Sequence, residues 1–158
     1  DAPNERDGNR SNYMANALVS LVGNDRELAV YGSEAYYEGP DSRLRRFTYR
    51  VDGFVSVQAG VEGGELTTKP LIFQGEQLVL NFVTRKGGSV KVELQDENGK
   101  PIPGFELASC QSLTGDSIEQ TVSWKTSDSV AKLSGKTIRI RFVIQNGDVY
   151  SLRFRRLI

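Results

Sequence analysis

Four acidic residues lie close together in the sequence around a pair of tyrosines, Tyr36 and Tyr37. The acids are Glu34, Glu38, Asp41 and Asp52. Glycoside hydrolysis is the chemistry such a cluster could perform, because it needs two carboxyl groups about 5 to 10 Å apart, one protonated and one ionised. Solvated strand ends whose acids pair with nearby arginines would explain the same residues without catalysis. We expect the second situation, and therefore no catalytic residue.

The tyrosines indicate a second kind of chemistry, the binding of a sugar. The aromatic face of a tyrosine suits the apolar C–H face of a pyranose, and the phenol adds a hydrogen bond. The candidate carbohydrate-binding residues are Tyr31, Tyr36, Tyr37 and Arg43. The alternative is that strand tyrosines pack at a sheet edge with the hydroxyl group in water.

Four arginines follow the tyrosines and alternate with or flank apolar residues. They are Arg43, Arg45, Arg46 and Arg50. Together they could form a site for an anion. Surface ion pairs with the neighbouring acids are the preferred interpretation, and each such pair contributes only about 0 to 1 kcal/mol to stability.

The composition argues against several classes of function. Histidine is absent, which removes the usual general base near neutral pH and the commonest transition-metal ligand. Cys110 is the only cysteine, so neither an internal disulfide nor a thiolate metal cluster can form. Twenty basic and twenty acidic side chains cancel, which argues against a nucleic-acid partner. No apolar stretch approaches the roughly 20 residues of a membrane span, so no membrane partner is expected.

No cofactor is expected, with calcium as the one alternative left open. The segment Asp96-Glu-Asn-Gly offers side-chain and backbone oxygens of the kind that Ca²⁺ binds. It lacks the regular spacing of an EF-hand and reads first as a hairpin turn. The glycines from Gly60 to Gly64 lack the lysine of a phosphate-binding loop and predict a plain connection between strands.

The elements that must position these residues are β-strands. Short runs of β-branched and aromatic residues recur from Glu27 onward, with turn residues between them at the roughly 8- to 12-residue spacing of all-β domains. The pattern predicts about nine strands and an antiparallel, jelly-roll-like β-sandwich. The expected strands are 27–31, 44–51, 54–59, 66–73, 78–84, 90–95, 118–124, 138–144 and 149–154.

Turn residues between these runs predict local connections, and therefore antiparallel sheets. Gly87-Gly88 and Asn146-Gly147-Asp148 fit tight hairpins, and Asn98-Gly99 fits a turn with positive φ. Trp124 and Val122 share one face of a strand opposite polar residues, which places the tryptophan in the core.

Two segments are less regular. Residues 11–22 allow either a helical face or a strand and irregular structure, because asparagines and serines interrupt the apolar positions. Residues 99–115 carry several prolines and glycines and predict a long loop across one end of the sandwich.

Several phrases of the sequence resemble a known family. They are Ser42-Arg-Leu-Arg-Arg-Phe-Thr-Tyr-Arg-Val-Asp-Gly-Phe-Val-Ser-Val-Gln-Ala-Gly, Gly64-Glu-Leu-Thr-Thr-Lys-Pro-Leu-Ile-Phe, Leu80-Asn-Phe, Gly88-Ser-Val-Lys-Val-Glu-Leu-Gln-Asp, Pro101-Ile-Pro-Gly-Phe, Gly115-Asp-Ser, Trp124-Lys and Val149-Tyr-Ser-Leu-Arg-Phe. They resemble the C-terminal part of bacterial glycoside-hydrolase-like proteins that pair a five-bladed β-propeller with a β-sandwich. The resemblance covers roughly residues 28–154, and its motifs are structural rather than catalytic.

The resemblance implies an organisation. In those proteins the propeller holds the acids that would act on a glycosidic bond, and the sandwich follows the last blade. By that analogy, residues 1–49 are an irregular N-terminal segment, a remnant of the last blade or of its connection, and residues 50–158 are the sandwich. Nearly all of the propeller is missing from this chain, so the resemblance carries no glycosidase activity over to it.

The resemblance also implies a function. We expect a non-catalytic accessory module that packs against and stabilises an upstream catalytic propeller domain. The alternative is a carbohydrate-binding module that holds a polysaccharide through exposed tyrosines, and a self-sufficient glycosidase is the weakest alternative. A secreted or periplasmic location follows from the resemblance alone, since the sequence leaves the compartment open.

Overall fold

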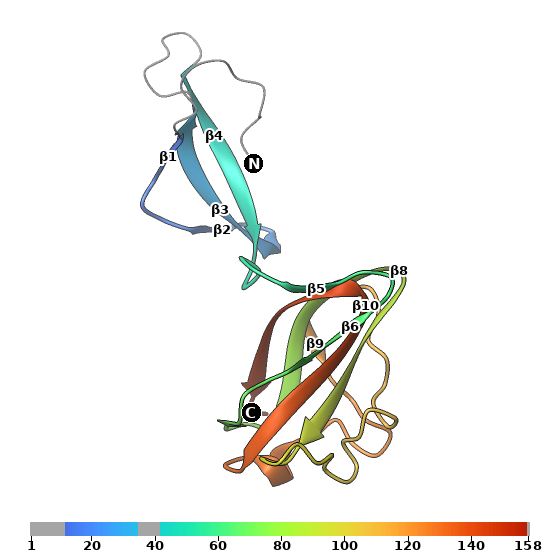
Figure 1. Ribbon diagram of the computed structural model, residues 1–158. Helices are drawn as coiled ribbons and strands as arrows, with labels where there is room; N and C mark the ends of the chain where they lie inside the picture. The colour runs from blue at the N-terminus through green and yellow to red at the C-terminus, as the bar shows by residue number, and fades with distance from the viewer. Residues whose placement is uncertain (1–11, 35–41, 158) are drawn as a thin grey trace. The chain divides into compact units, whose positions relative to one another are not determined.

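The computed structural model describes residues 12–34 and 42–157, and these form two compact units, Asp1–Phe54 and Val55–Ile158 (Figure 1). The fold is all-β, and every strand pairing within the described residues is antiparallel. A short 3-10 helix occurs at Ala131–Leu133. The predicted fold class, an antiparallel all-β sandwich, is confirmed. In the described part of the chain, no helix has the length and apolar character needed to cross a membrane.

The N-terminal unit is a four-stranded sheet built around one long central strand. Its strands are β1 (Asn12–Met14), β2 (Val19–Leu21), β3 (Asn24–Glu34) and β4 (Arg43–Arg50). β4 pairs with one edge of β3, while β1 and β2 pair with successive stretches of its other edge. The sheet is therefore three strands wide.

This unit is more regular than the sequence led us to expect. The helical alternative for residues 11–22 is wrong, because two short strands occupy the described part of that segment. Both strands find partners on β3, and pairing across a sheet outweighs the weak helical preference of a segment rich in asparagine and serine. The compact units divide after Phe54, a few residues beyond the expected boundary.

The sandwich unit is built on two very long strands. Its strands are β5 (Val57–Ala59), β6 (Gly64–Thr67), β7 (Leu71–Ile72), β8 (Gln77–Gln95), β9 (Asp116–Thr121) and β10 (Thr137–Arg155). β10 pairs with β8 along almost its whole length, and β8 carries β9 on its other side. The short strands β5, β6 and β7 all pair with β10.

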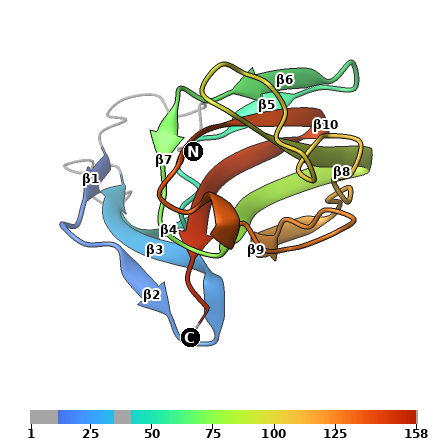
Figure 2. The ribbon, with the colours of Figure 1, turned by 90° about the horizontal axis from the view of Figure 1, so that it is seen from below.

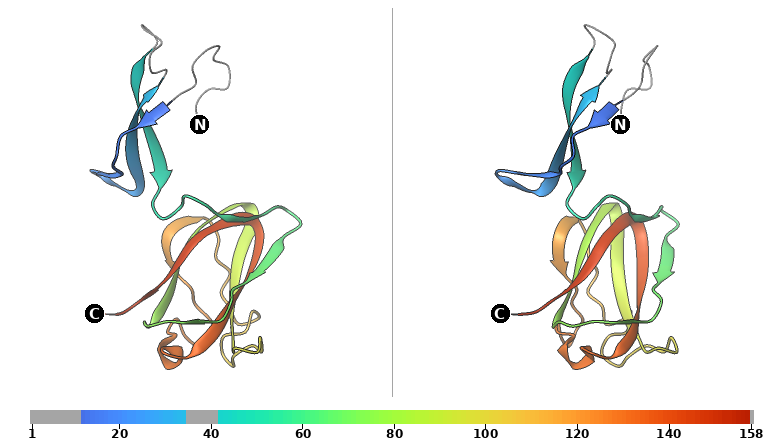
Figure 3. Two further views of the ribbon diagram at one scale, coloured as in Figure 1. Left: turned by 60° about the vertical axis from the view of Figure 1, so that its left-hand side comes forward. Right: turned by 90° about the vertical axis from the view of Figure 1, so that its left-hand side faces the viewer.

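The two predicted hairpins within β8 and β10 are wrong. Thr84 pairs with Gly147 and Ser89 pairs with Gln145, so four residues of β8 lie opposite Asn146 alone. This irregularity bends both strands together around a corner, as Figures 1 and 3 show, and Figure 2 shows them side by side. Strands that turn a corner at a bulge can contribute to both layers of a sandwich. Glycine and asparagine serve bulges as readily as turns, which explains the wrong prediction.

The core lies between the two halves of the bent strands. Leu80 and Phe82 come from the first half of β8, and Val92 and Leu94 from the second, and all four are in one buried cluster. β10 adds apolar side chains at alternate positions to the same cluster, and Ile140 is one of them. The predicted alternation in residues 90–95 and 138–144 is therefore the alternation between core and outer surface.

The predicted core position of Trp124 is confirmed. Its side chain is buried, its Nε1 donates a hydrogen bond to the Val92 carbonyl oxygen at 3.1 Å, and Phe105 packs edge-on against its ring at 5.0 Å. Phe105 comes from the long segment 99–115, which has only isolated bridges, as predicted. That loop supplies core side chains as well as spanning the sandwich.

The predicted turn at Asp96-Glu-Asn-Gly is also present. One carboxylate oxygen of Asp96 accepts hydrogen bonds from the backbone N–H groups of Asn98 and Lys100, each at 2.9 Å, and Gly99 has a φ of 84°. The acid therefore closes its own turn, as the hairpin interpretation predicted, and calcium stays the alternative to the prediction of no cofactor.

Candidate functional site

The two faces of the N-terminal sheet are the surfaces that combine the predicted site residues with exposed apolar side chains. β3 and β4 pair without a bulge, so directly opposed residues point to the same face. One surface, which we call the Tyr31 face, consists of Tyr13, Val19, Ala29, Tyr31, Ser33, Leu44, Arg46 and Thr48. The other, which we call the Phe47 face, consists of Met14, Ser20, Leu28, Val30, Gly32, Glu34, Arg43, Arg45, Phe47 and Tyr49.

The Phe47 face is apolar around Phe47 and charged at one end, where Glu34, Arg43 and Arg45 lie. Met14 and Phe47 lie over Gly32, because a Cβ atom at that glycine would be 2.8 Å from the Met14 sulfur and 3.4 Å from a Phe47 ring carbon. The Tyr49 ring lies 5.8 Å from the ring of Phe54, between centroids. Val30 is buried, but Met14 and Tyr49 remain 45% and 37% exposed. This face is half-covered by its own side chains and needs a second layer to be buried fully.

The Tyr31 face mixes aromatic, aliphatic and polar side chains. Tyr13 and Tyr31 stand on adjacent strands, because Tyr13 pairs with Ser33, two residues from Tyr31. Both tyrosines are exposed, and Leu44 on the other side of Ser33 is 76% exposed. Arg46 lies directly opposite Tyr31. Exposed tyrosines with hydrogen-bonding groups beside them are the kind of side chain on which a sugar ring can stack.

The structure does not bring Tyr31 and Arg43 together. They project from opposite faces of the sheet, because Tyr31 is opposed to Arg46 while Arg43 is opposed to Glu34. The other two predicted binding residues, Tyr36 and Tyr37, lie outside the described residues. Tyr13, Leu44 and Arg46 were missed as members of this surface. The alternation in residues 44–48 could have indicated the last two.

Arg43 and Arg45 pair with a neighbouring acid, as the sequence predicted, but the prediction of solvated surface pairs is wrong for Glu34, whose side chain is buried. The Nε of Arg43 and an Nη of Arg45 each lie 2.6 Å from a different oxygen of the Glu34 carboxylate, which is fully buried. Two guanidinium groups thus compensate one buried acid at the end of the Phe47 face. Removing the arginines would be destabilising, because it would leave the buried carboxylate uncompensated.

The predicted cluster of acids does not converge among the described residues. Glu34 is opposed to the first residue of β4, whereas Asp52 follows the last residue of that strand. An eight-residue strand is about 25 Å long, far beyond the carboxyl separation that glycoside hydrolysis requires. The remaining two acids, Glu38 and Asp41, lie outside the described residues. Glu34 and Asp52 therefore cannot act as a pair.

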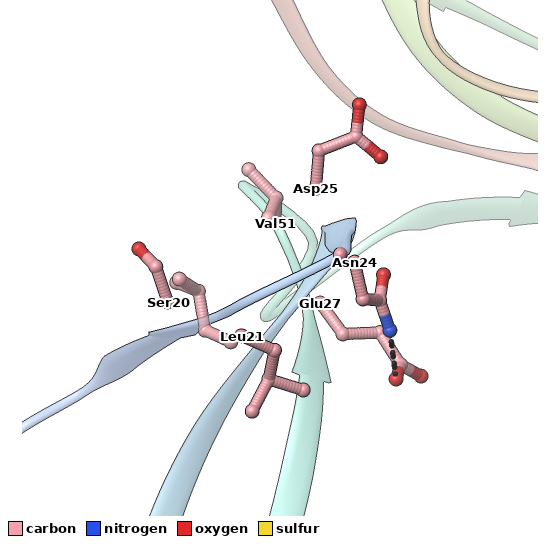
Figure 4. A pocket seen from close by; sticks show the side chains of 8 residues that line it. Ser20, Leu21, Asn24, Asp25, Glu27 and Val51 are labelled. Atoms are coloured by element: carbon pink, nitrogen blue, oxygen red, sulfur yellow. Dashed lines mark hydrogen bonds between the residues drawn. The ribbon is translucent and has the colours of Figure 1, made fainter.

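An open hollow of about 690 Å³ lies in the N-terminal unit near the turn between β2 and β3. Its lining includes Ser20, Leu21 and Val51 together with two acids, Asp25 and Glu27 (Figure 4). Glu27 accepts a hydrogen bond from the Asn24 amide at 2.9 Å, and Figure 4 shows Asp25 pointing to a different side. These carboxylates do not face one another, so the hollow lacks the paired acids of a glycosidase.

The charged groups of the sandwich unit form structural networks. The buried carboxylate of Glu93 accepts hydrogen bonds from the Gln95 amide at 2.8 Å and from the Leu107 N–H at 3.0 Å. Arg141 pairs with it at 3.4 Å and with Glu65 at 2.8 Å. Burial raises the pKa of Glu93, but the hydrogen bonds from these groups outweigh burial and hold the pKa below its ordinary value. The acid is kept ionised and is unsuited to proton donation.

A second network closes the corner of the bent strands. Ser56 donates a hydrogen bond to one oxygen of the buried Asp148 carboxylate at 2.9 Å, and an Nη of Arg85 lies 2.9 Å from the other oxygen.

Within the residues that the structure describes, no cluster of three metal-ligating side chains occurs. Comparison with known proteins adds no constraint, since no family model, curated protein or solved structure matches this chain.

Proposed function

We propose that this chain is a non-catalytic accessory module of a larger glycoside-hydrolase-like protein, and that it packs against and stabilises an upstream catalytic propeller domain. The observation that carries the proposal is the Phe47 face. An apolar sheet face normally packs against a second layer of structure. The described part of the N-terminal unit consists of one sheet and contains no second layer.

The energetics of the face support packing against another domain. Burying a large apolar side chain fully contributes roughly 1.5–3 kcal/mol. Met14, Tyr49 and Phe54 together offer several kcal/mol to a partner that covers them, because each is more than a third exposed. Exposed apolar side chains occur on both faces of this sheet, and contiguous exposed apolar surface is typical of an interaction site.

The resemblance of residues 28–154 to the C-terminal part of propeller-containing proteins supports the choice of partner. A catalytic role for the chain itself has little support, because Glu34 is held between two arginines and Asp52 lies at the far end of β4. Turnover of an aryl glycoside by the wild-type chain, abolished by Glu34→Gln or Asp52→Asn, would contradict this part of the proposal.

The experiment that tests the proposal is the binding of a hydrophobic fluorescent dye. We expect the wild-type chain to bind the dye, and we expect the double variant Met14→Ser, Tyr49→Ser to bind much less. Leu44→Ser is the matched control on the opposite face of the same sheet, and Ile72→Ser is a control on the sandwich unit. Both control side chains are well exposed, at 76% and 66%.

Two results would contradict the proposal. The first is a monodisperse wild-type chain that binds no dye. The second is a loss of dye binding in the Leu44→Ser or Ile72→Ser control that equals the loss in the double variant, since the dye would then report no particular face.

A carbohydrate-binding module is the second candidate function, and the Tyr31 face is the observation that favours it. We expect affinity electrophoresis through a panel of soluble polysaccharides to retard the chain on a neutral glycan if this function holds. Tyr31→Ala would then restore free mobility, and Tyr49→Ala, the same substitution on the opposite face, would not. Tyr36→Ala and Tyr37→Ala test the two predicted residues outside the described part. Uniform mobility of the wild-type chain on every glycan would remove this candidate.

A further inference from the structure

β4 forms one edge of the N-terminal sheet, because it pairs only with β3 among the described strands (Figure 1). The Val51 N–H donates a hydrogen bond to the Arg26 carbonyl oxygen at 2.9 Å, in the same register as the β3–β4 pairing. Hydrogen-bonded residues alternate along an antiparallel ladder. The odd-numbered residues of β4 therefore bond to β3, and Leu44, Arg46 and Thr48 direct their backbone groups away from the sheet.

This edge is basic and apolar at the same time. β4 contains four arginines and no acid. Arg43 and Arg45 are compensated by Glu34, whereas Arg46 is exposed and opposite Tyr31, with no ion pair to an acid of the described part. Leu44 adds an exposed aliphatic side chain to the same edge. An added strand would thus lie beside the uncompensated Arg46 on the Tyr31 face, and beside Phe47 and Tyr49 on the Phe47 face.

The charge of β4 selects the kind of strand that fits. A second copy of this chain would place its own arginines beside those of the first copy, and like charges directly opposed across two strands are destabilising. A strand with acidic side chains would gain favourable cross-strand pairs instead. Charged residues also protect edges against unwanted pairing, and the arginines of β4 would do so against a second copy of this chain.

We propose that β4 accepts an additional strand from the upstream domain, and that this strand alternates acidic and apolar side chains. Backbone hydrogen bonds to Leu44, Arg46 and Thr48 would give the affinity, as in other cases of strand addition, and the arginines would select the partner. This inference rests on the proposed function, because it specifies how the upstream domain is bound.

The test uses a synthetic eight-residue peptide that alternates valine and glutamate, added to the full chain. Amide hydrogen exchange is measured at residues 44, 46 and 48. At a peptide concentration of about ten times its Kd, exchange at these amides should slow about tenfold, because only the unbound fraction exchanges. The control is the same peptide N-methylated at every amide, which keeps the charge but cannot pair with a strand edge.

Thr48→Pro gives an independent check on the protein side. Proline is tolerated on edge strands where the N–H faces solvent, so this variant should fold as the wild type does and lose the protection. Thr48→Ala is the matched control and should keep the protection. A near-ultraviolet circular dichroism spectrum like that of the wild type shows that Thr48→Pro has folded.

The outcomes separate this inference from the proposed function. Strand addition at β4 is supported if the unmodified peptide slows exchange and the N-methylated peptide does not. No change in exchange, or equal slowing by the N-methylated peptide, overturns the edge inference, and dye binding at the Phe47 face would then leave the proposed function standing. Absence of dye binding refutes the proposed function, whatever the peptide does.

Discussion

Gly88 lies so close to the backbone of Asn146 that a Cβ atom at residue 88 would be 2.4 Å from the Asn146 carbonyl oxygen. This close approach joins β8 and β10 at the corner where both strands bend. Only a residue without a side chain fits there, because the obstacle is backbone rather than a movable side chain.

Gly88→Ala is therefore expected to destabilise the sandwich unit by roughly 1–3 kcal/mol, as overpacking of a tight site does. Gly60→Ala is the matched control, because a Cβ atom at Gly60 would meet nothing within 4 Å. Chemical denaturation of the two variants measures the difference. Equal stability of the two variants would show that β8 and β10 can move apart at the corner without lowering the free energy of unfolding.

Glu93 is expected to stabilise the sandwich in a pH-dependent manner. Its pKa is lowered in the folded protein, so the unfolded state binds the proton more tightly and folding is favoured at neutral pH. The ordinary pKa of the carboxyl group is about 4.5, and its pKa in the folded state is lower. The contribution to stability is therefore lost as the pH falls below 4.5 and then through the folded-state pKa. We expect Glu93→Gln to cost about 1–3 kcal/mol near pH 7.

The measurement for Glu93 is the free energy of unfolding of the wild type and the variant between pH 7 and pH 3. Their difference should shrink with acidification. Glu65→Gln is the control, because Glu65 is 55% exposed at its side chain while sharing the same arginine. A difference between Glu93→Gln and the wild type that stays constant across this range would contradict the role assigned to the carboxylate.

Phe105 is expected to be as important to stability as a residue of a central strand, although it lies in a long loop. It is 1% exposed and packs against Trp124. Phe105→Ala should destabilise the sandwich by about 3–5 kcal/mol, as such truncations do in a core. Ile72→Ala, at an exposed apolar position, should change stability by less than about 0.5 kcal/mol. Similar thermal midpoints for the two variants would refute this ranking.

Cys110 is expected to be unreactive in the folded chain. The thiol is buried, and burial raises its pKa, so the reactive thiolate is scarce at pH 8. Modification by a thiol reagent at this pH should be far slower in the native chain than in denaturant. Equal rates would show that the loop carrying Cys110 opens readily.

The sequence allowed the fold class to be predicted, because alternation in residues 90–95 and 138–144 reports directly which side chains face a core. It did not reveal that residues 78–84 and 90–95 are halves of one strand. The glycines between them look the same whether the chain reverses or bends at a bulge. The difference depends on β10, which is distant in sequence.

The candidate site was only partly predictable for a related reason. The alternation of side chains along one strand shows that Leu44 and Arg46 share a face. It does not show which face of β3 they share, because the register between β3 and β4 is set by pairing and by the connection between the strands. Tyr31 and Arg43 were therefore grouped together, although the register places them on opposite faces.

The most direct test of the central claim, that the described part of the N-terminal unit contains no second layer over its sheet, is residue-resolved amide hydrogen exchange on the full chain. The account predicts that the amides of β3 and β4 that bond to one another exchange through openings of much lower free energy than those of β8 and β10, because few apolar contacts hold the sheet together. Equal protection in the two units would contradict it, since the N-terminal sheet would then be complete without a partner.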